Sequence, residues 1–319
     1  MIFDGKLIFI TGGTGYLGRR LIRRLLSGQE GFPEKIIVLC RSENSVRSIP
    51  KDEIIQVEMG DLDNISLLRS IIKETNIVMH LAAVKQIPLL ESFPEEAIRV
   101  NLLSTQNILQ AVKEVGVNVE SVLGISTDKA CKPVNVYGMC KALMERLLCN
   151  CKWVGTGVRM FCVRYGNVIN STGSVIPLFL NQIKSGDKVT ITNPSMTRFF
   201  ISSGKAINAI FDSLKRANCG DIFIPHIKSY RLGDIPKLLD PGCQVQVTGT
   251  RPGEKIHEIL VSEEELSRTA ISNGYFSIRP FGSEVDNQGL SQEYSSRDNL
   301  MSDEEMAALI KEEMHEPVA

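Results

Sequence analysis

The sequence predicts an α/β protein built on a doubly wound parallel sheet, with a smaller and discontinuous substrate-binding α/β lobe. Three observations predict this fold. Short apolar runs alternate with helical patterns, a glycine-rich turn follows the first run, and this regular alternation gives way to shorter, less regular segments near residue 166. The apolar runs are continuous in Ile, Val and Leu rather than alternating. Such runs are typical of strands that are covered on both faces.

The expected elements follow one another in a regular order. We expect strands at residues 6–11, 35–40, 54–58, 77–81, 122–126, 160–164 and 221–225. Apolar residues at helical spacing predict helices at residues 17–25, 101–115, 137–148, 205–214 and 302–314.

Two stretches interrupt this pattern and are rich in Gly, Pro, Ser and Asn. We therefore expect residues 1–165 and 199–225 to form a dinucleotide-binding domain. Residues 166–198 and 226–319 are expected to form the substrate-binding lobe and the C-terminal tail.

The composition argues against several functional classes. The chain has 319 residues with 36 basic and 37 acidic side chains, so the net charge of −1 does not favour nucleic-acid binding. The N-terminus runs straight into a strand-like segment, and no apolar run approaches the roughly 18 residues of a spanning helix. The eight cysteines show no paired C-x-x-C spacing for a metal. We expect a cytoplasmic protein with reduced cysteines, no metal and no membrane segment.

The glycine-rich turn predicts a dinucleotide site. Gly12, Gly15 and Gly18 lie between the first strand and the first helix. Glycines there let the backbone approach a pyrophosphate, whose charge is met by amides at the helix N-terminus. The same turn adds three expected cofactor contacts, Thr14, Tyr16 and Leu17.

The ends of the next strands indicate which cofactor binds. An arginine after the second strand suits a 2′-phosphate, so Arg41 and Ser42 favour NADP, while nearby Glu43 keeps NAD as the alternative. Contacts to the adenine and to the dinucleotide where it crosses the sheet edge are expected from the ends of the third and fourth strands, at Asp61, Leu62, Ala82 and Ala83.

A possible catalytic group follows the fifth strand. Tyr137 and Lys141 lie one helical turn apart, and a nearby cation favours the phenolate that could accept a hydroxyl proton near neutral pH. Asp128 and Lys129 come at the end of the preceding strand, at the edge where such sheets bind ligands.

Four separated segments carry a resemblance to a known family: residues 126–141 (STDKACKPVNVYGMCK), 164–177 (RYGNVINSTGSVIP), 196–199 (MTRF) and 251–258 (RPGEKIHE). The chain resembles the inverting UDP-N-acetylglucosamine 4,6-dehydratases, in the polysaccharide-biosynthesis branch of the extended short-chain dehydrogenases. The resemblance implies a Rossmann fold and a redox-neutral reaction that gives a UDP-4-keto-6-deoxy-hexosamine. Relatives commonly self-associate, so a homo-oligomer is expected.

The resemblance also implies roles for the polar groups. Tyr137 would take the proton from the sugar O4 while a hydride leaves C4. Lys129, with its pKa lowered by Lys141 or by burial, would remove the C5 proton. A protonated Asp128 would help the C6 hydroxyl leave as water, before a hydride returns to C6 and a proton to C5.

Further residues are expected to bind the cofactor or the UDP-sugar. The additional cofactor contacts are Lys85, Asn101, Ser126, Tyr137 and Lys141. The substrate contacts are Lys85, Thr127, Asn167, Ser174, Val175, Pro177, Thr197, Arg198, Arg251 and Glu254, with the two arginines as diphosphate ligands.

Other readings of the sequence remain open. His257 and Glu254 could be structural, and Cys131 and Cys140 are expected to be packing residues. Retaining 4,6-dehydratases carry an Asp-Glu pair where this chain has Asp128-Lys129, and a UDP-hexose 4-epimerase would need no second acid/base pair. A non-catalytic NADP-binding regulator would not require the four polar groups.

Overall fold

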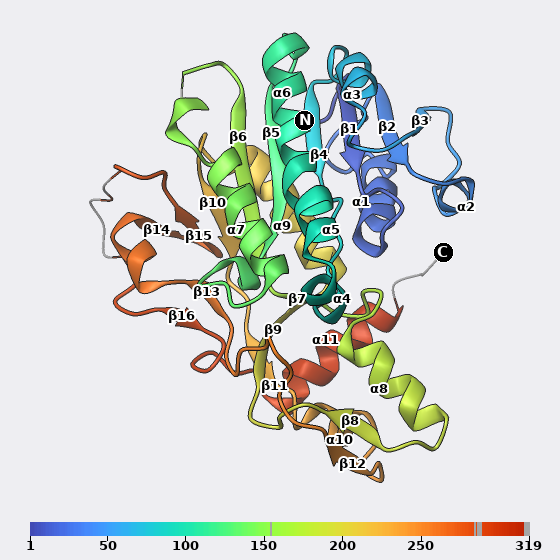
Figure 1. Cartoon of the computed structure of the whole chain (residues 1–319), viewed down its shortest axis with the longest axis vertical. Helices are drawn as coiled ribbons and strands as arrows, with labels where there is room; N and C mark the ends of the chain where they lie inside the picture. The colour runs from blue at the N-terminus through green and yellow to red at the C-terminus, as the bar shows by residue number, and fades with distance from the viewer. Residues whose placement is uncertain (154, 284, 286–288, 316–319) are drawn as a thin grey trace.

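The computed structural model describes residues 1–153, 155–283, 285 and 289–315. Within them the chain forms a nine-stranded sheet and three smaller sheets (Figure 1). The large sheet has the order β14-β15-β10-β6-β5-β4-β1-β2-β3. Its strands are β1 (Leu7–Thr11), β2 (Lys35–Cys40), β3 (Ile55–Met59), β4 (Ile77–His80), β5 (Ser121–Thr127), β6 (Arg159–Tyr165), β10 (Ile222–Pro225), β14 (Thr269–Ser272) and β15 (Tyr275–Ile278).

The parallel part of this sheet confirms the doubly wound prediction. Every neighbouring pair from β10 to β3 is parallel. The strand order reverses between β1 and β4, and ligands bind outside the carboxyl ends of the strands at such a reversal. The observed strands lie within a few residues of the expected ranges.

The antiparallel edge was not predicted. β14 and β15 form a hairpin on β10, although residues 269–278 were expected in the lobe. Tyr275 stacks on Phe223 of β10 with 4.3 Å between ring centroids, and Phe276 and Ile278 are buried. The hairpin therefore extends the sheet beyond β10, and this apolar contact helps to hold it there. The division into two folding units stays a prediction.

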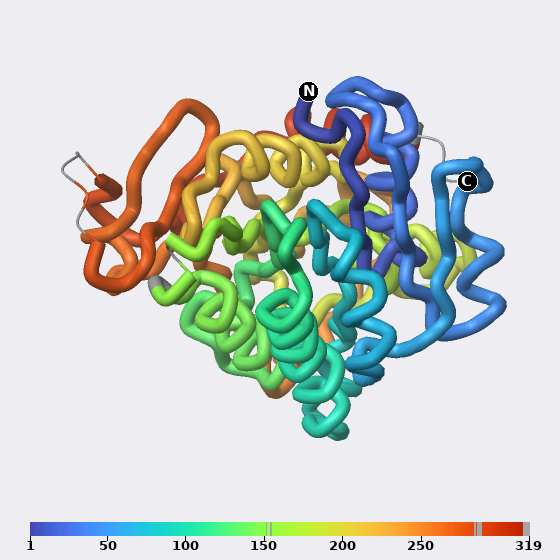
Figure 2. Tube along the Cα trace, turned by 90° about the horizontal axis from the view of Figure 1, so that it is seen from above, coloured from blue at the N-terminus to red at the C-terminus, as the bar shows by residue number. Residues whose placement is uncertain are grey.

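Helices cover both faces of the large sheet. Figure 2 shows α6 and α7 on one side and the yellow helix α9 on the other, where α1 contacts it. The helices on this sheet are α1 (Tyr16–Leu26), α3 (Ile65–Ile72), α6 (Ser104–Val115), α7 (Val136–Leu148) and α9 (Ser203–Arg216). Three short helices lie in the connections, α2 (Glu43–Val46), α4 (Ile87–Ser92) and α5 (Pro94–Ile98).

The smaller lobe lies beyond the carboxyl ends of the parallel strands (Figure 1). Its strands are β7 (Asn167–Val168), β8 (Val189–Ile191), β9 (Thr197–Ile201), β11 (Ser229–Arg231), β12 (Val245–Val247), β13 (Ile259–Val261) and β16 (Tyr294–Ser295). Its helices are α8 (Val175–Lys184), α10 (Ile235–Leu239) and α11 (Asp303–His315).

A separate apolar core holds together the part of this lobe around α8 and α11, whereas Leu260 and Val261 of β13 belong to the core of the large sheet. The separate core joins Phe179 of α8 and Val189 of β8 to Met306, Leu309 and Ile310 of α11. The acidic C-terminal helix therefore packs on the lobe. In the described part of the chain, no helix is both long enough and apolar enough to cross a membrane.

Candidate functional site

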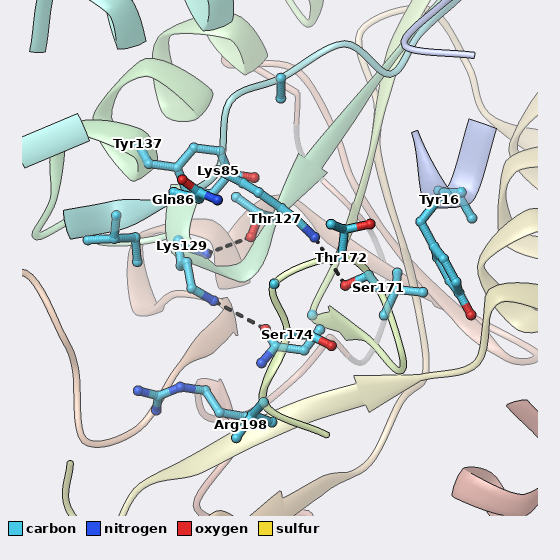
Figure 3. A pocket seen from close by; sticks show the side chains of 18 of the residues that line it. Tyr16, Lys85, Gln86, Thr127, Lys129, Tyr137, Ser171, Thr172, Ser174 and Arg198 are labelled. Atoms are coloured by element: carbon cyan, nitrogen blue, oxygen red, sulfur yellow. Dashed lines mark hydrogen bonds between the residues drawn. The ribbon is translucent and has the colours of Figure 1, made fainter. Parts of the chain in front are cut away.

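A cavity of about 1130 Å³ lies between the strand ends and the smaller lobe. Figure 3 shows Tyr16 on one side of this cavity and Lys129 and Tyr137 on the other. Eighteen of the residues expected from the sequence line it. They are Gly12, Gly15, Tyr16, Leu17, Gly18, Ala83, Lys85, Ser126, Thr127, Lys129, Tyr137, Lys141, Asn167, Ser174, Val175, Arg198, Arg251 and Glu254.

The glycine turn has the shape that a dinucleotide pyrophosphate needs. Gly12 has a φ of +73°, and a Cβ there would lie 2.6 Å from the backbone nitrogen of Ala82. A Cβ on Gly18 would lie 2.3 Å from the carbonyl oxygen of Gly12. No side chain caps the N-terminus of the first helix after Gly15. The first backbone N–H groups of this helix are therefore available to an anion. These residues fit a dinucleotide cofactor.

Tyr16 links this turn to the C-terminal helix. Its hydroxyl donates a hydrogen bond to Glu313 of α11, and Glu313 also lies 3.1 Å from Arg20 of α1. Burial, followed by the contact with Glu313, raises the pKa of Tyr16. The helix that completes the lobe core therefore also contacts the cofactor turn.

Several expected cofactor residues lie outside the cavity lining. Arg41 is exposed after β2, and Ser42 caps α2 by accepting from the Ser45 amide at 3.4 Å. Asp61 lies 3.6 Å from Arg99, and Leu62 is buried. The Thr14 carbonyl accepts a hydrogen bond from Arg19, 2.6 Å away.

Ala82 and Asn101 do not line the cavity, but their hydrogen bonds fix the backbone next to residues that do. The Ala82 amide donates to Thr11 Oγ1 at 3.2 Å. Asn101 is fully buried, and its side-chain amide makes two 2.8 Å hydrogen bonds with the backbone of Val84. Asn101 lies in a π-helical turn at Arg99–Leu103, a feature that often occurs at functional sites.

The turn after β5 brings an amine and a carboxylate together. Lys129 Nζ lies 2.9 Å from Asp128 Oδ1 and 3.3 Å from Asn167 Oδ1. Thr127 Oγ1 donates to Asp128 Oδ1 at 3.0 Å and accepts from the Lys129 amide at 3.4 Å. Asp128 is fully buried behind Lys129 and does not itself line the cavity, and its Oδ2 has no hydrogen-bond partner among the described residues.

Close packing fixes α7 against this turn. A Cβ on Gly138 would lie 2.2 Å from the carbonyl oxygen of Lys129, so only glycine allows the approach. Asn135 caps the helix by accepting from the Gly138 amide at 2.7 Å and donates to the Gly253 carbonyl at 2.8 Å. This contact holds Tyr137 and Lys141 on the cavity wall beside Lys129.

The protonation states differ from those expected from the sequence. Burial does lower the pKa of Lys129, as expected, but the carboxylates of Asp128 and Glu258 outweigh it and raise the pKa to about 12, so the net lowering expected from the sequence is wrong. Burial raises the pKa of Tyr137 to about 12, with a partial opposing effect from Lys129, so a phenolate near neutral pH was also wrong. Both groups hold their protons in this structure.

Two other shifts agree with acid/base chemistry. Burial raises the pKa of Asp128, while the Lys129 ammonium opposes this shift, so the carboxylate is easier to protonate than a solvent-exposed one. Burial lowers the pKa of Lys141 to about 8. Burial also raises the pKa of the Cys131 and Cys140 thiols, which keeps both protonated.

Most of the expected substrate residues line the cavity, and two do not. Lys85 donates to Ser171 Oγ at 3.0 Å inside the cavity, and Arg251 is exposed at its rim. Arg198 lines the cavity, but its guanidinium donates to the carbonyls of Thr197 and Lys255 at 2.8 and 2.9 Å.

Pro177 and Thr197 do not line the cavity. Pro177 lies within the first turns of α8. Thr197 instead contacts His257, with 2.9 Å between Oγ1 and Nδ1, which gives this histidine a structural partner.

The structure adds site residues that the sequence did not suggest. Glu258 is 2% exposed and lies 3.5 Å from Lys129 Nζ. Its position directly before an apolar strand was the available signal, because a charge there must find partners when it is buried. Unexpected lining residues include Gln86, Ile87, Pro88, Leu89, Ile125, Tyr165, Gly166, Val168, Ser171, Thr172, Gly173, Leu178, Phe179, Thr190, Ile191, Thr192 and Leu232.

Comparisons with known proteins agree with this geometry. Residues 8–280 match the family described as "Polysaccharide biosynthesis protein". The chain is 35% identical to an inverting UDP-N-acetylglucosamine 4,6-dehydratase of Campylobacter jejuni, over 88% of this chain and 84% of the relative. It is 37% identical to a UDP-glucose 4-epimerase of Rickettsia rickettsii, over 87% and 84%. The X-ray structure of Pen from Bacillus thuringiensis superimposes with a TM-score of 0.89 at 30% identity, over 98% and 100% of the two chains.

Proposed function

Because the chain belongs to the polysaccharide biosynthesis protein family, we propose that it catalyses the NADP-dependent 4,6-dehydration of UDP-N-acetylglucosamine with inversion at C5. The product is a UDP-4-keto-6-deoxy-hexosamine. The observation that carries the proposal is the Lys129–Asp128 contact of 2.9 Å beside Tyr137, because elimination of water needs a base and an acid together. The similarity to the Campylobacter dehydratase supports it.

The cofactor would be held along the glycine turn. The backbone amides of the Gly12–Gly18 turn would hold the pyrophosphate, and Lys141 and Tyr137 would hold the nicotinamide ribose, since these residues line the cavity. Arg41, exposed after β2, favours the 2′-phosphate of NADP over NAD. When bound, the cofactor would supply the redox chemistry, as the acceptor of the hydride from the sugar C4 and the donor of that hydride to C6.

The side chains supply the proton transfers. Tyr137 accepts the O4 proton, and its raised pKa means that the reactive phenolate fraction grows with pH. Lys129 removes the C5 proton while Asp128 donates a proton to the departing C6 hydroxyl, so the C6–O bond breaks and water leaves. A proton from solvent then adds to C5 from the opposite face, and the cycle closes when Tyr137 and Lys129 release the protons that they accepted, one of them to the Asp128 carboxylate and the other to solvent.

The resting ion pair can reach its reactive form through one proton transfer. If a proton moves from Lys129 Nζ to Asp128 Oδ1 across their hydrogen bond, the products are a neutral amine and a carboxylic acid. These are the base and the acid that the elimination needs. The transfer is uphill while the pKa of Lys129 is about 12, so its cost depends on the charges around the amine.

The proposal is tested by proton NMR of the product after incubation with UDP-N-acetylglucosamine in D₂O, with NADP or NAD in parallel samples. Dehydration creates a C6 methyl group, and deuterium at C5 with the inverted configuration identifies the inverting reaction. Retained configuration would contradict inversion. Recovery of unchanged substrate in both samples would contradict the whole assignment.

A UDP-hexose 4-epimerase is the second candidate function. The 37% identity to the Rickettsia UDP-glucose 4-epimerase favours it, and epimerisation needs only Tyr137, Lys141 and the cofactor. The same NMR experiment with UDP-glucose separates the two reactions, because epimerisation leaves C6 as a hydroxymethyl group. A retaining dehydratase would give the methyl group without inversion.

A further inference from the structure

We infer that Glu258 is a positioning residue for Lys129: it holds the amine in place and controls when that amine can accept a proton. The inference deepens the proposed function, since it assumes that Lys129 is the C5 base. Glu258 lies directly before β13, in the smaller lobe, whereas Lys129 follows β5 of the large sheet. The two carboxylates around the amine therefore come from distant parts of the chain.

The geometry places the Lys129 amine between several acceptors. Asp128 Oδ1 is 2.9 Å away, Asn167 Oδ1 is 3.3 Å away and Glu258 Oε1 is 3.5 Å away. The backbone of Glu258 is fixed by two 2.8 Å hydrogen bonds with Ser296. An ammonium has three N–H groups. Glu258 can therefore hold the Lys129 amine electrostatically while the hydrogen bonds from that amine to Asp128 and Asn167 rearrange.

The Glu258 carboxylate is incompletely satisfied for a buried group. Its Oε2 has no hydrogen-bond partner among the described residues, although Lys255 Nζ lies 3.7 Å from it. Arg198 Nε lies 3.8 Å from Oε1. Leaving a buried charged oxygen without a hydrogen bond costs free energy. A purely structural ion pair would be more stable with a hydrogen-bond donor to this oxygen. The open acceptor instead suits a group whose task is electrostatic.

The charges that face Lys129 decide how its protonation responds. Asp128 and Glu258 favour the ammonium, whereas Arg198 opposes it. The other titratable groups around the amine are Lys85, which it repels, and Tyr137. If Glu258 loses its charge, a single carboxylate remains beside Lys129 against two nearby cations, so the neutral amine becomes easier to form.

The test is an NMR titration of Lys129 in protein labelled with ¹³C at lysine Cε, with the signal assigned from a Lys129→Met sample. In Glu258→Gln the titration of Lys129 should move down by about 1 to 3 pH units from wild type, because one opposite charge at this range shifts a pKa by that amount. The matched control is Glu263→Gln, an exposed carboxylate that faces Lys132 across 3.7 Å. It should leave Lys129 unchanged.

An unchanged Lys129 titration in folded Glu258→Gln overturns the inference. Glu258→Asp keeps the charge but withdraws it by one methylene group, so it should give a smaller downward shift. If the Gln variant does not fold, a wild-type titration in the Asp variant overturns the inference instead.

Turnover gives a second readout that a structural role would not move. With the proposed activity, the pH at which C5 exchange rises should fall in Glu258→Gln by the same shift as the NMR titration. A changed KM with an unmoved pH profile would mean that Glu258 only supports the fold. The titration itself needs no turnover, so a failure of the proposed function leaves this inference testable.

Discussion

Two buried charge clusters lie next to each other at the ends of β5 and β6, and they are built differently. In the first, Arg164 uses its Nε, Nη1 and Nη2 groups on Glu145, Glu265 and the Leu260 carbonyl, over 2.6–2.9 Å. In the second, Lys129 lies among Asp128, Asn167 and Glu258, and two carboxylate oxygens have no hydrogen-bond partner within the described residues.

The difference indicates which cluster supports the fold and which one does chemistry. The Arg164 cluster is saturated and does not line the cavity, so its charges have no spare capacity for a ligand. The Lys129 cluster borders the cavity through Lys129 and Asn167, and its two carboxylates, Asp128 and Glu258, lie buried behind that surface, each with one oxygen that has no hydrogen-bond partner among the described residues. Ser126 pairs with Arg164 in the sheet register and also donates a hydrogen bond to Glu145. The saturated Arg164 cluster therefore supports the end of β5, from which the Lys129 cluster follows.

The largest expected effect comes from removing the amine of the reactive cluster. Lys129→Ala should lower the rate of dehydration by about 10²–10⁴-fold, because it removes a general base. Binding of NADP should persist, since the glycine turn is untouched. The measurement is product formation by NMR alongside cofactor binding by calorimetry, with the more exposed Lys132→Ala as control. A folded and fully active Lys129→Ala protein would rule out Lys129 as the C5 base.

The next effect comes from breaking the saturated cluster. Glu145→Ala leaves the buried Arg164 guanidinium with unpaired N–H groups, which should cost about 3–5 kcal/mol of unfolding free energy. Urea denaturation measures this loss, and Glu114→Ala on α6 serves as an exposed control. Unchanged stability with lost activity would mean that the two clusters have the opposite roles.

Much of the large sheet could be predicted because its signals are local. Continuous apolar runs mark β1, β2 and β4, and the glycine turn follows β1 directly in the sequence. The polar residues after β5 were predictable for the same reason, since parallel strands end at one edge of a sheet.

The rest depends on contacts between distant residues. Glu258 reaches Lys129 across 3.5 Å only after the lobe has folded onto the sheet, and no local pattern encodes that contact. The pKa of Lys129 could not be predicted from Lys141, because the charges that raise it are the adjacent Asp128 and then Glu258, which comes from another segment. The β14–β15 hairpin was missed because its place on the sheet depends on Phe223, far back in the chain.

A smaller effect of opposite sign is expected from the second buried lysine. Lys141 is 2% exposed, and burial lowers its pKa from 10.5 to about 8, so the folded protein binds this proton less tightly than the unfolded chain does. The resulting penalty is fully present below about pH 8 and disappears as the pH rises through the unfolded value. Lys141→Met should therefore be more stable than wild type by roughly 3 kcal/mol at pH 7, since each pKa unit is worth about 1.4 kcal/mol.

The difference in stability should vanish between about pH 8 and pH 10.5, because wild type loses its penalty there while the Met variant has none. Urea denaturation across this range measures it, with Lys113→Met on the exposed face of α6 as the control. A Met variant that is less stable than wild type at pH 7 would mean that Lys141 is paired and stabilising, like Arg164. A variant that is stabilised but inactive would instead indicate that Lys141 is needed for catalysis although it lowers the stability of the fold. Lys141 would then be a functional residue like Lys129.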